Sequence, residues 1–173
     1  MIKKIAVILS VAMTMGSVLC ACGDKEENTS QVNSAVSQNV VQEKTLTDVF
    51  SDIKTQVNVS EMVEFQDVSS LDRYYGITAE QVSEFAGGIN NSGVEQEEIV
   101  LLKASSDADV EALKTALENR RQSKLNENKN YNPEQAEIIE KCSVETNGLY
   151  VFMIISPNNE QMTQIFKTDL NLS

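Results

Sequence analysis

The side chains in this sequence that could carry out chemistry are few, and the composition excludes several classes of mechanism. The 173 residues include three cysteines but no histidine. Without histidine there is no Ser–His–Asp or Cys–His catalysis, no histidine-ligated metal and no typical general base near neutral pH. The chain has 26 acidic and 14 basic residues, a net charge of −12, and no basic stripe. That balance argues against a nucleic-acid partner.

Two arginines are the charged residues best suited to bind a ligand. Arg73 lies between Asp72 and the pair Tyr74 and Tyr75, and Arg120 lies on or beside the apolar face of a predicted helix. A guanidinium group binds a carboxylate or a phosphate with two hydrogen bonds, and tyrosine rings line grooves for sugars or peptides. The interpretation we favour is structural, with the arginines in ion pairs that tie a helix to the sheet and the tyrosines at the edge of the core. All four nevertheless remain candidate binding residues.

The acidic residues and glycines make weaker cases for a site. Glu95, Glu97 and Glu98 precede or begin a predicted strand, where paired carboxylates could hydrolyse a glycoside. With 26 acids in the chain such neighbours arise by chance, and we expect these three to solvate the edge of a sheet. Asp107–Asp109 has too few oxygens for a calcium loop, and Gly87–Gly88 lacks the helix and lysine of a phosphate loop. We therefore expect no catalysis, no cofactor and no metal site.

The N-terminus has the pattern of an export signal. A basic start at residues 1–4 is followed by 15 uncharged residues, Ile5–Leu19. That run is shorter than the roughly 20 apolar residues that a membrane-spanning helix needs. It ends in Leu19-Cys20-Ala21-Cys22, which resembles a bacterial lipobox with a small residue before the modified cysteine. An uncleaved anchor helix is the alternative.

The lipobox resemblance implies cleavage before Cys22 and attachment of diacylglycerol to its sulfur. Two or more acyl chains give stable anchoring where one does not. We therefore expect residues 1–21 to be a signal peptide and the protein to be held by lipid on the extracytoplasmic face of the cell membrane. Cys142 is then left without a disulfide partner, and we expect it to be buried and structural because no histidine can activate it.

The rest of the chain divides into a linker and one domain. After Cys22, the apolar residues of the stretch 22–43 are only valines and alanines among polar side chains. We therefore expect a flexible polar tether. Residues 44–173 alternate helical and strand patterns. Apolar spacing and capping signals predict helices over 46–57, 69–75, 107–125 and 162–170, with another that begins at Pro133. Strands are predicted within 82–104 and 142–155, with turns at 90–93 and Asn147-Gly148, although the strand that begins at 82 could also start as a helical turn.

These elements predict an α+β fold. We expect a single two-layer domain with a mainly antiparallel sheet of about four strands and helices packed on one face. A domain of this length buries enough apolar surface to need no disulfide.

An ordered set of short segments is similar to a known family. The set comprises Leu71–Ile77, Glu97–Ile99, Ala116–Arg120, Tyr131–Gln135, Gly148–Val151 and Ile155–Pro157. It resembles the lipoproteins of the domain-of-unknown-function family 4358, small envelope proteins of Gram-positive bacteria, over about residues 45–170. The resemblance implies a location and a fold, but no reaction and no functional residues.

The sequence thus predicts a lipid-anchored extracytoplasmic envelope protein whose domain is a non-catalytic binding module. The expected partners are the membrane, through lipid on Cys22, and an envelope protein or wall component. The alternative is a receptor for a small ligand or ion, such as a transporter accessory. A carboxylate-dependent hydrolase is a less favoured third hypothesis.

Overall fold

The computed structural model describes residues 43–172. The predicted signal peptide, the candidate lipid-attachment residue Cys22 and all but the last residue of the predicted linker lie outside this range. No helix among the described residues combines the length and apolar character needed to cross a membrane.

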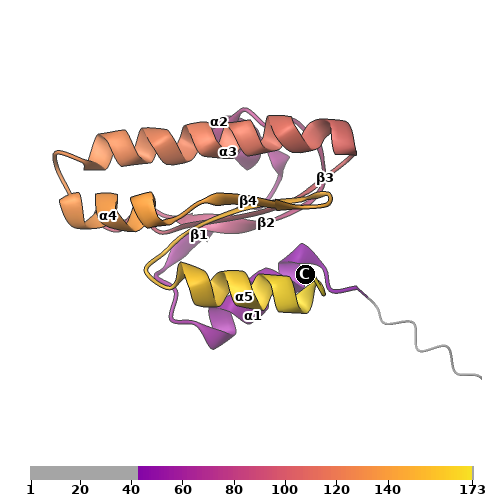
Figure 1. Ribbon diagram of the computed structural model, residues 1–173, viewed down its shortest axis with the longest axis horizontal. Helices are drawn as coiled ribbons and strands as arrows, with labels where there is room; N and C mark the ends of the chain where they lie inside the picture. The colour runs from indigo at the N-terminus through magenta and orange to yellow at the C-terminus, as the bar shows by residue number, and fades with distance from the viewer. Residues whose placement is uncertain (1–42, 173) are drawn as a thin grey trace, which may run out of the picture. The chain divides into compact units, whose positions relative to one another are not determined.

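Within the described range, five antiparallel strands form one sheet in the order β1-β2-β3-β5-β4, and five helices cover it (Figure 1). The α+β class predicted from the sequence is confirmed. In chain order the elements of residues 43–172 are α1 (Leu46–Gln56), β1 (Met62–Glu64), α2 (Val68–Tyr75), β2 (Val82–Asn90), β3 (Glu98–Ala104), α3 (Asp107–Asn128), α4 (Pro133–Lys141), β4 (Val144–Asn147), β5 (Tyr150–Ile155) and α5 (Asn159–Asp169).

The helices cover both faces of the sheet, which corrects the expectation of two layers with helices on one face. α2, α3 and α4 lie on one side, and α1 and α5 lie on the other (Figure 1). The reason lies in β5, whose six residues are all buried. Side chains on a strand point alternately to opposite faces, so a strand that is apolar throughout must be covered on both sides.

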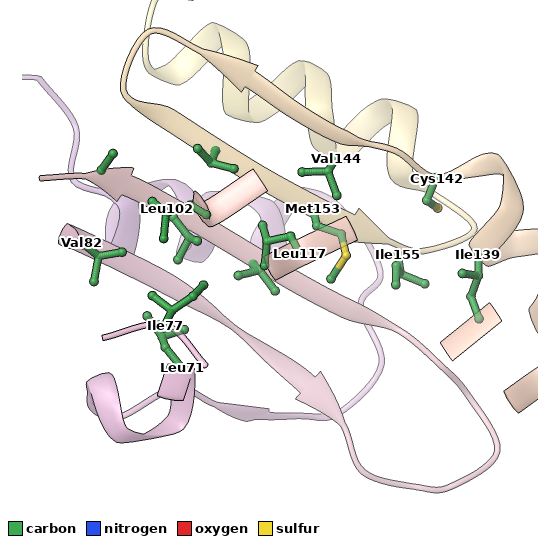
Figure 2. Packing of buried hydrophobic residues seen from close by; sticks show 14 of the residues in the cluster. Leu71, Ile77, Val82, Leu102, Leu117, Ile139, Cys142, Val144, Met153 and Ile155 are labelled. Carbon is green, nitrogen blue, oxygen red and sulfur yellow. The ribbon is translucent and has the colours of Figure 1, made fainter. Parts of the chain in front are cut away.

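Each face of the sheet has its own hydrophobic core. On the α2–α3–α4 face, alternate strand residues such as Leu102 and Met153 pack against Leu71 and Leu117 of the helices (Figure 2). On the α1–α5 face, the other strand residues pack against helical side chains that include Phe166. The central strands β3 and β5 therefore contribute to both cores.

The ends of α1 and α2 follow the predicted capping signals with one correction. Thr45 and Asp48 form a capping box at α1, in which Thr45 Oγ1 accepts from Asp48 N at 3.1 Å. At α2 the cap is Asp67 rather than the predicted Ser69, because the Asp67 carboxylate accepts from the Ser69 backbone N–H at 3.0 Å. A carboxylate is an equally good N-cap acceptor, and it starts the helix earlier. Gly76, with a φ of 69°, ends α2 as predicted.

The strand β1 was not predicted, and it is the fifth strand of the sheet. It is only three residues long, and it pairs with β2 next to Gly87. Gly87 has a φ of 139°, and a Cβ atom there would lie 1.9 Å from the carbonyl oxygen of Ile99. Glycine is therefore required for the local path of β2, and the Gly87 carbonyl accepts a hydrogen bond from Phe65 N at 3.0 Å. A strand this short leaves too little apolar alternation to be recognised in the sequence.

Candidate functional site

A fully buried carboxylate lies at the centre of the candidate site. Glu98, the first residue of β3, has no exposed side-chain surface. Arg120 Nε donates to Oε1 at 3.1 Å and Arg120 Nη2 donates to Oε2 at 3.0 Å, a bidentate pair. Lys124 Nζ donates to Oε2 at 2.8 Å, and the Tyr75 hydroxyl donates to Oε1 at 2.9 Å. Each carboxylate oxygen therefore accepts two hydrogen bonds.

The helical repeat of α3 brings the two cations to the same carboxylate. Arg120 and Lys124 follow Leu113 and Leu117 at intervals of three and four residues, so all four lie on the buried face of the helix. Glu98 points to that helix because it has the same parity in β3 as Val100, which packs in the core beneath α3. The ion cluster is thus a polar continuation of the hydrophobic interface between α3 and the sheet.

The electrostatics of the cluster keep its charges in place. Burial alone would raise the pKa of the Glu98 carboxyl, but Lys124 and Arg120 outweigh burial and hold that pKa below its ordinary value. Burial likewise opposes the charge on Arg120, while its hydrogen bonds to Glu98 raise the pKa of the guanidinium. Burial, and then the neighbouring Glu98 carboxylate, raises the pKa of the Tyr75 hydroxyl, which therefore stays protonated as a donor. Two cations face one anion, so the cluster has one excess positive charge.

A pocket of about 430 Å³ opens beside this cluster, between α2, α3, β1 and the loop that joins β2 to β3. Lys124 and Arg120 are the least exposed of the charged residues that line it, with side-chain exposures of 5% and 24%, and together they form its floor. Arg73 and Tyr74 line it from α2, and both are exposed. The pocket therefore combines a cationic floor with an aromatic wall.

Three of the four predicted binding residues come together in this pocket. Arg73, Tyr74 and Arg120 all line it, and the guanidinium carbons of Arg73 and Arg120 lie 5.7 and 5.8 Å from the centre of the Tyr74 ring. Such distances suit cation–π contacts. Tyr75 does not line the pocket, because its hydroxyl is bound to Glu98 below it. For Arg120 the favoured structural interpretation and the binding interpretation both apply, since it pairs with Glu98 and also faces the pocket.

The sequence prediction missed Lys124 and misjudged two of the acids. Lys124 is four residues after Arg120 on the same stripe, a spacing that could have identified it. Glu97 and Glu98 do not solvate a sheet edge, because they are 7% and 0% exposed, whereas Glu95 is exposed as expected. Glu98 can be buried because Arg120 and Lys124 of α3 and Tyr75 of α2 bind its carboxylate. These partners are remote in the sequence, so the burial could not be predicted from it.

Glu97 belongs to a separate polar cluster. Its carboxylate accepts hydrogen bonds from the Ser60 backbone N–H at 2.9 Å, from the Ser60 hydroxyl and from the Ser156 hydroxyl. These contacts join the segment after α1 to the ends of β3 and β5. The adjacent cavity has a volume of only about 90 Å³, so we assign this cluster to packing rather than to binding.

Cys142 is buried, as predicted. Its thiol donates to the Ile138 carbonyl at 3.1 Å, and burial raises its pKa. A thiol held protonated in the core is a poor nucleophile. Within residues 43–172 no group of three or more acidic or cysteine side chains is arranged to hold a metal ion.

Comparison with known proteins adds one finding. The model of a family described as a domain of unknown function (DUF4358) matches residues 55–156, more than half of the chain. The matched segment contains Glu98, Arg120 and Lys124 together with Arg73 and Tyr74. Searches of curated proteins and of solved structures found no match.

Proposed function

The chain belongs to the DUF4358 family, whose function is unknown, and from that premise we propose that it is a lipid-anchored, extracytoplasmic binding module of the cell envelope that performs no catalysis. Its binding site is the pocket between α2 and α3, and its partner is an envelope protein or wall component that inserts an anionic group there. The cationic floor of that pocket is the observation that carries this proposal.

The floor is suited to binding because its cations are fixed in place before a partner arrives. Arg120 is held by a bidentate pair with Glu98, and Lys124 is held by the same carboxylate. A site whose side chains are already ordered loses less entropy on binding than a flexible one. Arg120 still has the two N–H groups of Nη1, for which the described residues provide no acceptor, so a partner's oxygens can complete its hydrogen bonding.

The absence of catalysis is supported by the state of the reactive side chains. Glu98 has all its oxygens engaged and a lowered pKa, so it is a poor general acid or base. The Cys142 thiol is buried and has a raised pKa. The third hypothesis, a hydrolase, requires two carboxyls in one cleft with pKa values pushed apart. The Glu98 carboxyl beside the pocket instead has a lowered pKa, because Lys124 and Arg120 outweigh the effect of its burial.

The anchor and location rest on the N-terminal sequence. The lipobox at Leu19–Cys22 supports lipid attachment at Cys22, and the polar residues 23–43 support a tether between lipid and domain. Replacing Cys22→Ser is expected to move the protein from the membrane fraction to the soluble fraction and to abolish labelling by a radioactive fatty acid. Labelling that persists in this variant would contradict the anchor.

A small-ligand receptor is the second candidate function. The pocket volume of about 430 Å³ lies within the range of small-molecule sites, roughly 300–1,000 Å³. On this alternative the anionic group belongs to a free molecule instead of a macromolecular partner.

Capture of partners by cross-linking on intact membranes tests the binding proposal. Arg73→Ala removes an exposed cation from the pocket, and we expect it to abolish or strongly weaken capture of a specific partner. Lys141→Ala, an exposed cation at the end of α4 that does not line this pocket, is the matched control and should leave capture unchanged. Equal capture by both variants would exclude the pocket as the binding site.

A further inference from the structure

The charged side chains that line the pocket differ in how exposed they are to solvent. The least exposed of the charged side chains, Arg120 and Lys124, are both cationic. Three glutamates, Glu64, Glu95 and Glu127, also line the pocket, and all three are exposed. Arg73 is an exposed cation at the same rim, so a molecule that enters meets three acids and one cation at the rim and two cations at the floor.

The floor still has hydrogen-bond donors to offer. Lys124 is more than nine-tenths buried, and within the described residues the Glu98 carboxylate is its one acceptor. An ammonium group has three N–H donors, so two of them have no protein partner here. Buried donors without acceptors are costly, and an anionic group with two oxygens would satisfy them together with Arg120. The excess positive charge of the cluster favours the same occupant.

The rim acids restrict which anion can bind. Glu64 is paired with Lys54, and Glu95 accepts a hydrogen bond from Asn90 Nδ2 at 2.9 Å. Glu127 lies two turns after Arg120 on α3 and has no salt bridge within the described residues. A doubly charged phosphate would be repelled by these carboxylates, whereas a simple cation would be repelled by the floor. A ligand with one negative and one positive group complements both.

We propose that the pocket binds a small zwitterion with a carboxylate and an ammonium group, either a free amino acid or a short peptide with free termini. The carboxylate contacts Arg120 and Lys124 at the floor, and the ammonium group faces Glu95 and Glu127 at the rim. The exposed ring of Tyr74 provides an apolar wall beside the ligand. This inference rests on the proposed binding pocket, and it names the chemical class of ligand for the second candidate function, the small-ligand receptor.

Isothermal titration calorimetry on the full chain in detergent tests the proposal. The probes are the twenty amino acids and their glycyl dipeptides, and the tightest of them is then compared with its N-acetyl and carboxamide derivatives. Each derivative removes one charge, so we expect each to bind about tenfold more weakly or worse. The zwitterion hypothesis would be overturned if no probe bound with a Kd below about 10 mM. It would also be overturned if one of the derivatives bound as tightly as its parent compound.

Variants place the ligand in the pocket. Glu127→Gln should weaken binding of the zwitterion severalfold but should not weaken binding of the N-acetyl derivative, because that derivative has no ammonium group and its carboxylate is repelled by Glu127. Glu111→Gln, an exposed acid on the same helix that does not line the pocket, is the matched control. Equal effects of the two variants would overturn the assignment of the site.

Two further probes separate this inference from the proposed function. The first outcome is that the protein binds inorganic phosphate or acetate as tightly as the best zwitterion and that Arg73→Ala weakens this binding. That result would overturn the zwitterion hypothesis but would leave an anion-binding pocket. The second outcome is that none of the small molecules binds, while partner capture still depends on Arg73. That result would also overturn the zwitterion hypothesis, but the proposed binding module would stand. Unchanged partner capture in Arg73→Ala, together with unchanged small-molecule affinity in Glu127→Gln, would overturn both proposals.

Discussion

Glu98 and Ile99 are neighbours in β3, but they point into two regions that are built differently. Glu98 faces α3 and joins Arg120, Lys124 and Tyr75 in a buried ionic cluster beside a pocket. Ile99 faces α1 and α5, where the core is apolar and includes the rings of Phe152 and Phe166, which are 4.3 Å apart between centroids and tilted by 40°. One strand thus separates a polar interface from an apolar one.

The difference between the two faces shows that the polar face contributes less to stability for its size than the apolar face does. Buried ion pairs often stabilise no more than apolar side chains of the same size would, because desolvation offsets their attraction. The apolar face needs only shape and volume to hold α1 and α5 against the sheet. The polar face holds charged groups in fixed positions at the wall of a cavity, which suits recognition better than stability.

The largest expected effect comes from removing the shared carboxylate. Glu98→Gln leaves the charges of Arg120 and Lys124 buried without an anion, so we expect a loss of about 3–5 kcal/mol in the free energy of unfolding. Urea denaturation measures it. Glu118→Gln, which breaks the more exposed pair with Arg121, should cost at most about 1 kcal/mol. Similar losses in the two variants would mean that the Glu98 cluster is as well solvated as a surface pair.

The contribution of the tyrosine hydroxyl should be smaller. Tyr75→Phe removes one donor from the Glu98 carboxylate, and hydrogen bonds to charged groups contribute about 1.5–3 kcal/mol. Tyr74→Phe is the matched control, because that tyrosine is exposed and its hydroxyl does not contact Glu98. Thermal unfolding should distinguish the two variants. A Tyr75→Phe protein as stable as the control would show that the hydroxyl is replaceable by water.

The ionic face should also make the protein sensitive to acid. The pKa of Glu98 is lowered in the folded state, so its stabilising contribution is complete above the ordinary glutamate pKa of about 4.3 and is lost as the pH falls through the lower folded value. Each unit of lowering corresponds to about 1.4 kcal/mol. The stability gap between the wild type and Glu98→Gln should therefore narrow as the pH falls from 7 towards 3. A gap independent of pH would contradict the assignment to Glu98.

The smallest effect is expected on the apolar face. Ile99→Val removes one methyl group from a fully buried side chain and should cost about 0.5–1.5 kcal/mol. Binding in the pocket should not change, because the side chain points away from it. Denaturation together with calorimetry on the same sample measures both properties. A loss of ligand affinity in this variant would show that the two faces of β3 are coupled.

Local sequence patterns were sufficient for most helices and strands. The capping box of Thr45 and Asp48, Pro133 after Asn132, and the Asn147-Gly148 turn each specify structure through bonds or dihedral angles within a few residues. These signals act over short distances, which explains why the predicted elements agree with the structure. The edge strand β1 escaped prediction because it is short and because its close pairing depends on Gly88, more than twenty residues away, where a Cβ atom would lie 2.9 Å from the carbonyl oxygen of Val63.

The candidate site was predicted only in part, since its residues come from three separate elements. Arg73, Tyr74 and Arg120 were identified by residue type and position on predicted helices. The burial of Glu98 and the role of Lys124 were not, because neither is evident until α3 packs across the start of β3.

By itself, the sequence determined the approximate positions and the types of most elements, because capping, turn and periodicity signals are local. Its composition alone excluded histidine chemistry. The tertiary structure decided that helices cover both faces of the sheet, and it decided which acid is buried. Those outcomes depend on contacts between residues that are far apart in the sequence, such as Glu98 and Lys124, which are 26 positions apart. The free energy of such a buried pair is set by desolvation and by pairing, and both occur only when the chain folds.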